Sequence, residues 1–190
     1  CEDATVTRIE PQGREFLVEV EDGEPVQART ILLATGVHNL PPDMDRTEHG
    51  DALQRGLLRY CPICDGYEVT DQRVGVIGTG DHGMREALFL RGFTKHVTLI
   101  APGAAHELDA ACRAKLDEAG IEHLDGPCTP IRIVGDELSV TTASGERRFA
   151  SVYPALGSHI RSELAVAAGA VASDEGCLEV DDHQQTSVPG

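Results

Sequence analysis

Two short motifs hold the residues whose types and spacing could do chemistry. Cys61 and Cys64 form a Cys-x-x-Cys motif, and a glycine-rich run from Gly78 to Gly83 follows it closely. Thiols at this spacing can open and close a disulfide. Glycines at this spacing let a backbone approach a dinucleotide pyrophosphate. Together the two motifs predict that electrons from a nicotinamide nucleotide are delivered to a disulfide.

The cysteine pair allows three interpretations: a redox dithiol, half of a zinc site, or two structural thiols. A closed zinc site needs a second Cys-x-x-Cys motif or a suitably spaced pair of histidines, and the sequence has neither. We therefore expect no metal site and favour the redox dithiol, in which one thiol attacks a disulfide and the other resolves the mixed disulfide. Asp65 follows directly, either as a group that delivers or holds the exchanged proton or as a cap before Gly66.

Each glycine of the second motif has its own physical role. Gly78 allows the tight turn, Gly80 lets the backbone approach a pyrophosphate, and Gly83 lets helix and strand pack closely. The amides at the start of the helix would face the anion. A tight structural turn is the alternative. Because the motif follows an apolar run at 74–77 and opens a helical pattern, we favour dinucleotide binding.

The specificity element of a dinucleotide site is expected at the end of the strand that follows the glycine-rich helix. An acidic residue there would accept a hydrogen bond from the ribose, and an arginine would pair with a 2′-phosphate. After Ile100 the sequence instead has Ala101, Pro102 and Gly103. The side chains at this point therefore favour neither NADH nor NADPH.

Hydrophobic patterning predicts the elements that must position these motifs. The N-terminal part should form a small antiparallel meander, followed by a proline-containing linker at 39–43. The central part should contain a βαβ unit over 73–100, and a second boundary should fall near Gly157. We expect strands at 6–9, 16–20, 31–34, 74–77, 97–100, 121–124, 131–134, 138–142, 149–156 and 178–180, and helices after Gly83, around 108–119 and at 163–168.

Composition limits the class of protein. The sequence has 190 residues, and 32 acidic against 16 basic side chains give a formal net charge of −16. Such a charge repels phosphate backbones, so we expect no nucleic-acid partner. No apolar run reaches the roughly 18 residues of a membrane span, and the first residues lack the pattern of a secretory signal. We therefore expect a cytoplasmic protein without a membrane partner.

The remaining cysteines and the two ends of the chain complete the pattern. Cys1, Cys112, Cys128 and Cys177 stand alone in the sequence, and we expect each to be buried as a small apolar residue. The chain begins without methionine and stops at Gly190 without a final helix or tail. We expect it to be an internal segment of a longer protein.

The order and spacing of these motifs resemble the low-molecular-weight bacterial thioredoxin reductases. In most other disulfide reductases the dithiol lies in the flavin domain, whereas here it precedes the glycine-rich turn of the nucleotide domain. The match covers almost the whole chain. It rests on the residues Cys61–Tyr67, Gly78–Gly83, Glu86–Leu90, Ala34-Thr35-Gly36 and Gln184–Gly190.

The resemblance implies a flavoprotein in which NADPH or NADH reduces FAD, the flavin reduces a disulfide, and the dithiol reduces thioredoxin. By motif position Cys64 would face the flavin, Cys61 would attack the partner disulfide, and Asp65 would be the general acid. Relatives are commonly homodimers, which we expect here for the full-length protein. The residues expected at the cofactors are Gly78, Gly80 and Gly83 at the nicotinamide nucleotide and Ala34, Thr35 and Gly36 at the flavin.

The resemblance also implies the fold and the domain organisation. The fold should be α/β, with a Rossmann-like, three-layer nucleotide domain at 41–157 that carries the dithiol, and with parts of an FAD-binding domain at 1–40 and 158–190. The first glycine motif of the flavin site and its later Gly-Asp motif are not in this sequence, so we expect this segment alone to be inactive.

Three other functions stay open from the sequence. A dithiol oxidase of similar architecture would form disulfides in small molecules, and a related disulfide reductase would take electrons from ferredoxin. A non-catalytic nucleotide-sensing module would need no reactive cysteine pair.

Overall fold

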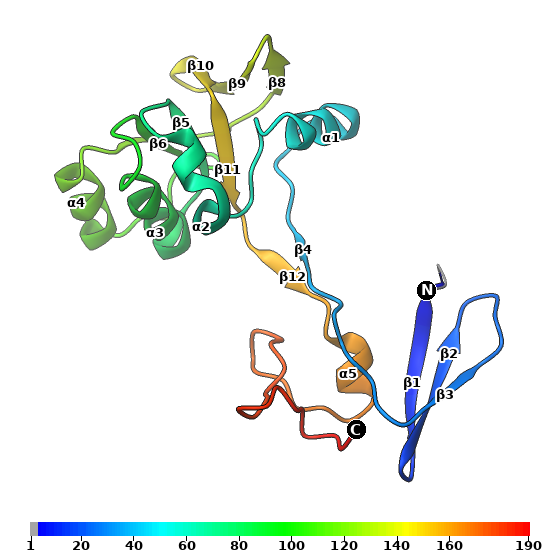
Figure 1. Ribbon diagram of the computed structural model, residues 1–190. Helices are drawn as coiled ribbons and strands as arrows, with labels where there is room; N and C mark the ends of the chain where they lie inside the picture. Colours follow the sequence, from blue (N-terminus) through cyan, green and yellow to red (C-terminus); the bar gives the residue numbers. More distant parts are fainter. Residues whose placement is uncertain (1–3) are drawn as a thin grey trace. The chain divides into compact units, whose positions relative to one another are not determined.

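The computed structural model describes residues 4–190, so Cys1 lies outside the described residues. The chain divides into two compact units. The first holds the residues up to His38 and those from Ser158 onward, and the second holds Asn39–Gly157. Figure 1 shows the second unit in cyan to yellow and the first in blue and in orange to red.

A four-stranded parallel sheet forms the centre of the second unit. Its strands lie in the order β11, β5, β6, β7, and every residue of β5, β6 and β11 is buried. Such continuous burial is typical of a parallel sheet that is covered on both faces. The strands are β5 (Val74–Gly78), β6 (Val97–Ile100), β7 (Glu122–Leu124) and β11 (Ser151–Ala155).

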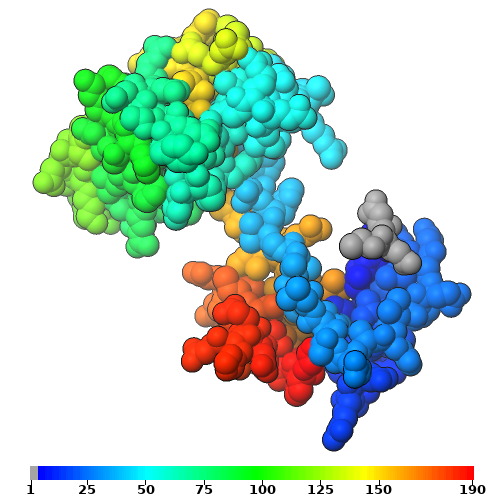
Figure 2. Space-filling model, viewed as in Figure 1, coloured from blue at the N-terminus to red at the C-terminus, as the bar shows by residue number. Residues whose placement is uncertain are grey.

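Two apolar clusters cover the two faces of this sheet. On one face Val76, Leu99 and Tyr153 pack in a cluster with residues of helices α3 (Gly80–Leu90) and α4 (Ala110–Glu118). On the other face Ile77 and Ile100 pack in a second cluster with a three-stranded antiparallel sheet. That sheet contains β8 (Ile131–Val134), β9 (Glu137–Thr142) and β10 (Gly145–Phe149). The three-layer α/β fold expected from the sequence is therefore confirmed, and Figure 2 shows the close packing of this unit.

Helix α1 (Arg46–Gln54) precedes the dithiol and has no counterpart among the sequence-based expectations. It begins at Asp45, whose carboxylate accepts hydrogen bonds from the amides of Thr47 and Glu48 at 2.8 and 3.1 Å. Ala52 of this helix is fully buried in the second cluster. The helix therefore anchors the segment that leads to Cys61.

The first unit contains an antiparallel meander, as expected from the sequence, and one short helix. The strands pair in the order β1, β2, β3, and Ile9 and Phe16 are its buried side chains. Two further short strands, β4 and β12, pair with each other. The bounds are β1 (Val6–Gln12), β2 (Glu15–Val20), β3 (Val26–Ala28), β4 (Val37–Asn39), β12 (Ser158–Ile160) and α5 (Glu163–Ala167).

Several sequence-based expectations for the elements were wrong. The expected strand at 31–34 is irregular, with Leu32 92% exposed, and the third strand of the meander is β3. The expected strand at 178–180 makes only an isolated bridge, between Ala172 and Leu178. The run expected as one strand at 149–156 is shared between the end of β10 and β11. Short apolar runs without a neighbouring strand to pair with do not stay extended in a sheet.

The single cysteines outside the Cys-x-x-Cys motif have different surroundings. Cys112 and Cys128 are buried, as expected, and burial contributes to the raised pKa of the Cys128 thiol. Cys177 is exposed, so its expected burial was wrong. It follows a polar turn in which the hydroxyl of Ser173 accepts a hydrogen bond from the Cys177 amide.

None of the helices within residues 4–190 has the length and apolar character needed to cross a bilayer.

Replacing Gly83 by alanine should weaken the packing of α3 on β5. An added Cβ at Gly83 would lie 2.8 Å from the carbonyl carbon of Gly78, which is backbone and cannot rotate away. We expect Gly83→Ala to lower the free energy of unfolding by about 1–2 kcal/mol, because overpacking outweighs the gain in helix propensity. Urea unfolding measures the difference, with Gly103→Ala as control because an added Cβ there has no neighbour within 4 Å. Equal stability of both variants would contradict this packing.

Candidate active site around the Cys61–Cys64 disulfide

Cys61 and Cys64 form a disulfide, with their Cα atoms 5.3 Å apart. Cys61 is the residue before the four-residue helix α2 (Pro62–Asp65), which starts with proline, a residue that favours the first helical position. The amide of Cys64 donates a hydrogen bond to the carbonyl of Cys61 at 2.9 Å. Cys64 is exposed and Cys61 is half-buried. A second thiol can therefore reach the disulfide from solvent.

The 3₁₀ helix η1 (Gly66–Val69) follows α2 and packs through a glycine. Gly66 is buried, and a Cβ at this position would lie 2.9 Å from the ring of Phe93. Phe93 itself contacts Phe89, with ring centroids 5.6 Å apart. The close approach at Gly66 brings the dithiol turn against the end of α3.

Asp65 makes two side-chain contacts and neither is a helix cap. Its carboxylate makes no capping hydrogen bond at the start of η1. Instead the hydroxyl of Tyr153 donates to Oδ1 at 2.8 Å, and Nη1 of Arg59 lies 3.2 Å from Oδ2. Burial and the Asp65 carboxylate together raise the pKa of Tyr153. Each carboxylate oxygen thus faces a donor from a different part of the chain.

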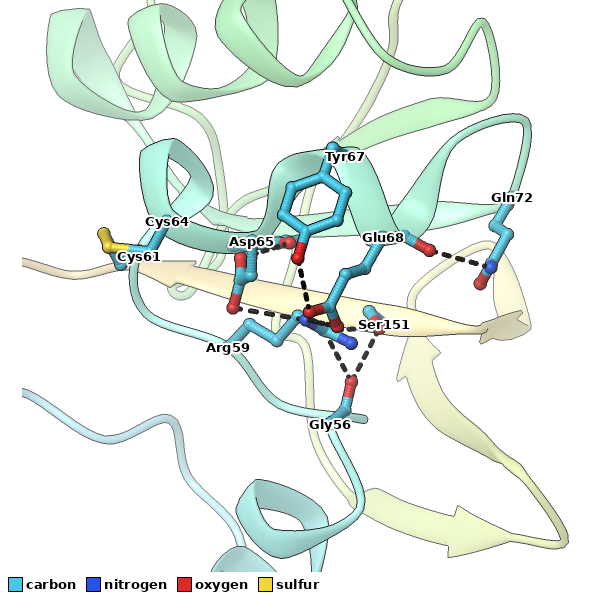
Figure 3. Close-up of polar contacts among 10 residues, drawn as sticks. Gly56, Arg59, Cys61, Cys64, Asp65, Tyr67, Glu68, Gln72 and Ser151 are labelled. Atoms are coloured by element: carbon cyan, nitrogen blue, oxygen red, sulfur yellow. Dashed lines mark hydrogen bonds and ion pairs between the residues drawn. A yellow bond between two sulfur atoms is a disulfide. The ribbon is translucent and has the colours of Figure 1, made fainter.

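Arg59 connects Asp65 to a second carboxylate and to the sheet (Figure 3). Nη1 of Arg59 lies 2.7 Å from Oε2 of Glu68, and Nε donates to the carbonyl of Gly56 at 2.8 Å. Nε also lies 3.3 Å from the hydroxyl of Ser151 at the start of β11. The Arg59 side chain is only 15% exposed. The guanidinium therefore joins the dithiol turn to the edge of the parallel sheet.

The charges in this cluster influence one another. Burial disfavours the charge of Arg59, but the carboxylates of Glu68 and Asp65 outweigh it, so the pKa of Arg59 lies above its ordinary value. The hydrogen bond and the charge of Arg59 lower the pKa of Glu68. Arg59 and Glu68 therefore favour each other's charged forms.

A polar hollow of about 480 Å³ lies beside this cluster. Arg59, Asp65 and Glu68 lie on its wall together with Tyr60 and Arg55. Arg55 is turned to other partners, with Nη2 3.0 Å from Asp136 and Nη1 3.3 Å from Asp51. The hollow therefore gives solvent access to the carboxylates behind the disulfide.

The glycine-rich turn lies in the same unit as the dithiol, at the carboxyl end of β5. Gly80 has a φ of +61°, which a glycine adopts without strain. A Cβ at Gly78 would lie 2.9 Å from Ala155 of β11, so the first glycine permits a close approach. The hydroxyl of Thr79 accepts a hydrogen bond from the amide of Glu107 at 2.6 Å. The βαβ unit and the helix start expected from the sequence are present.

The three residues expected at the flavin belong to the first unit. Ala34, Thr35 and Gly36 are exposed. The hydroxyl of Thr35 donates to the carbonyl of Arg161, and the Arg161 amide donates to the carbonyl of Gly36 at 3.1 Å. The structure thus brings Cys61, Cys64 and Asp65 together and places 34–36 in the other unit.

Sequence reasoning missed Arg59, Tyr153 and Glu68. Arg59 stands two residues before Cys61, where nothing in a Cys-x-x-Cys motif calls for a cation. Tyr153 gives a signal, because it is the one phenol in a strand that is buried throughout, and a buried tyrosine hydroxyl needs a partner. That signal predicts a polar partner without saying which one.

The sequence matches the family described as pyridine nucleotide-disulphide oxidoreductase over residues 1–190. The chain belongs to this family. Among curated members, it is 29% identical to an alkyl hydroperoxide reductase protein of Xanthomonas campestris pv. phaseoli, over 95% of the chain and 35% of that protein. It is 28% identical to thioredoxin reductase of Aquifex aeolicus, over 89% of the chain and 54% of that protein.

Solved structures of the family give the same result. The crystal structure of HlmI aligns with a TM-score of 0.85 and 29% identity, over 98% of this chain and 59% of HlmI. Thioredoxin reductase of Lactococcus lactis aligns with a TM-score of 0.62 and 25% identity, over 98% of this chain and 63% of that one. The chain thus spans about a third to two thirds of these family members. The expected resemblance to thioredoxin reductases is confirmed.

Removing the charge of Arg59 should destabilise the second unit. Arg59→Met leaves the partly buried carboxylate of Asp65 without its cation, and we expect a loss of about 2 kcal/mol in the free energy of unfolding. The loss is smaller than for a fully buried pair, because the Asp65 side chain is 25% exposed. Urea unfolding measures it. Arg55→Met is the matched control, since its partners Asp51 and Asp136 are 51% and 102% exposed, and surface pairs contribute less than about 1 kcal/mol. Equal losses in the two variants would contradict this role of Arg59.

Proposed function

We propose that the full-length protein is a flavin-dependent oxidoreductase that passes electrons from NADPH or NADH through FAD to the Cys61–Cys64 pair. The pair then reduces thioredoxin or a similar protein disulfide. The single observation that carries this proposal is the solvent-accessible disulfide in one unit with a glycine-rich βαβ turn. The thioredoxin reductases among the relatives support the choice of partner.

The reduced pair would act in two exchange steps. The Cys61 thiolate attacks one sulfur of the partner disulfide, that S–S bond breaks, and the released partner thiolate takes up a proton. The Cys64 thiol then loses its proton and attacks the Cys61 sulfur, which releases the second partner thiolate to take up another proton. Two electrons and two protons pass from the pair to the partner. The positions one turn apart in α2 suit this sequence of attack and resolution.

Asp65 is the group we propose to exchange these protons. It follows Cys64 directly, and its side chain lies on the wall of the polar hollow. A carboxylate beside a thiol can accept the proton as the thiol attacks and give it to the leaving thiolate. Each of its oxygens also accepts a hydrogen bond or an ion pair from the protein. Its orientation is therefore fixed while it exchanges protons.

The glycine-rich turn fits a nicotinamide nucleotide. It stands at the carboxyl end of β5 and opens α3, where ligands of open α/β sheets bind. The free amides of the first helical turn favour an anion such as a pyrophosphate. We propose that Gly78, Gly80 and Gly83 shape this site and that the unit from Asn39 to Gly157 is the nucleotide domain.

The first unit fits a part of a flavin domain. The segment Ala34-Thr35-Gly36 is exposed and is held by two backbone-directed hydrogen bonds to Arg161, so a planar ring system can lie against it. A flavin, when bound, supplies two-electron exchange between a nicotinamide and a disulfide. We propose that the residues up to 40 and those from 158 onward belong to the flavin domain.

A second candidate function is favoured by the segment after β6. Residues 101–105 carry no cation that would pair with a 2′-phosphate, and the backbone of Glu107 already occupies the Thr79 hydroxyl. An enzyme that does not use NADPH, either a dithiol oxidase or a ferredoxin-dependent reductase, needs no such cation. The dithiol chemistry of Cys61 and Cys64 would be the same in all three enzymes.

Substitution of Cys64 tests the central role of the pair. In the full-length protein we expect Cys64→Ser to abolish disulfide reduction, because no resolving thiol remains, while the flavin absorbance stays unchanged. Turnover of a protein disulfide and the visible spectrum are the two measurements. Cys177→Ser is the control, because Cys177 is exposed and forms no disulfide. Retained turnover in Cys64→Ser would overturn the assignment.

The electron donor separates the leading function from the second candidate. We expect the full-length protein to oxidise NADPH or NADH when a protein disulfide is supplied, with little oxygen uptake. Nucleotide absorbance and an oxygen electrode record the two rates in the same sample. Oxygen consumption with a small dithiol, and none of either nucleotide, would instead identify a dithiol oxidase.

A further inference from the structure

We propose that Tyr153 and Arg59 are positioning residues for Asp65, which set the pH at which the cysteine pair exchanges protons with water in the polar hollow. The inference rests on the proposed function of the cysteine pair. It goes beyond that function because it assigns a role to two side chains outside the Cys-x-x-Cys motif. The hydrogen bond from Tyr153 and the ion pair with Arg59 carry it.

The two donors come from elements that the fold holds in place. Tyr153 is fully buried in β11, where Tyr153 pairs with Val76 of β5. The Arg59 amide donates to the carbonyl of Val152 at 3.0 Å, so its backbone is bonded to the same strand. The two donors thus reach Asp65 from neighbouring positions on one rigid edge. By contrast, α2 has no buried residue of its own.

The opposite oxygens of the carboxylate receive these donors. Oδ1 accepts from the Tyr153 hydroxyl and Oδ2 faces Arg59. Hydrogen bonds and cations that meet the charged form of a carboxylate disfavour its protonation. Asp65 would therefore release a proton taken from Cys64 more readily than it would without Tyr153. Ready release matters because the same group must be free again for the next exchange.

Other titratable groups near Asp65 act in a known direction. Glu68 shares Arg59 with Asp65, and Tyr67 lies 3.4 Å from Glu68. The Cys61 and Cys64 sulfurs stand on the same turn. Helix α3 packs against α2 and carries Glu86, whose pKa burial raises to about 7. None of these groups donates a hydrogen bond to Asp65 among the contacts of residues 4–190, which leaves Tyr153 and Arg59 as its donors.

The test is the pH profile of disulfide reduction by the full-length protein carrying Tyr153→Phe. This change removes one hydroxyl and keeps the buried ring. Without the hydroxyl the charged carboxylate loses a donor, its protonation moves to higher pH, and the acid limb of the profile should shift upward by about one pH unit. Arg59→Lys is the second variant. It retains the charge but loses the planar fork, so we expect a shift in the same direction.

Tyr60→Phe is the matched control. It removes a phenol hydroxyl next to Cys61 that bonds His49 at 2.9 Å and has no contact with Asp65. We expect its acid limb to coincide with that of the unchanged protein. A purely structural role of Tyr153 would lower the rate equally at every pH, and that result would overturn the inference.

The inference and the proposed function fail in different ways. If Cys64→Ser retains turnover, the function itself is wrong, whatever Tyr153→Phe does. If Cys64→Ser is inactive and neither Tyr153→Phe nor Arg59→Lys moves the acid limb, the function stands and the positioning role is refuted. Should one variant fail to fold, the profile of the other decides.

Discussion

The position of the dithiol depends on one guanidinium group. Helix α2 has four residues and none of them is buried, and a helix this short is not stable by itself. What holds it is Arg59, whose side chain reaches Asp65 and Glu68 on the turn, and Gly56 and Ser151 at the sheet (Figure 3). The contact of Gly66 with Phe93 holds the other side of the turn. A reactive disulfide can thus stay exposed while its backbone is fixed.

This arrangement solves a conflict between reactivity and order. Exchange needs an accessible sulfur, which removes the apolar contacts that usually fix a side chain. The protein instead fixes the turn through charges next to the disulfide and leaves Cys64 exposed. The same charges lie beside a polar hollow, so protons have a short path to water. Positioning and proton exchange therefore depend on the same group of residues.

The sequence was sufficient for the features that repeat a periodic pattern. The βαβ unit at 73–100 was predictable, because an all-apolar strand, a glycine turn and an amphipathic helix each leave a local signal. The roles of Gly78 and Gly83 in close packing follow from the same turn. The strand expected at 31–34 failed because its apolar run has no partner strand, and no local signal shows that. Arg59 and Tyr153 could not be assigned to Asp65 from the sequence, because contacts between residues 59, 65 and 153 depend on the tertiary fold.

Reduction of the cysteine pair by a nicotinamide nucleotide tests the central claim most directly. The full-length protein is titrated anaerobically with NADPH and with NADH, and free thiols at Cys61 and Cys64 are counted by alkylation and mass spectrometry. We predict that both cysteines become alkylated after about one equivalent of at least one nucleotide, because two electrons open one disulfide. If the flavin is bleached while Cys61 and Cys64 remain joined, the pair does not lie on the electron path and the account is contradicted.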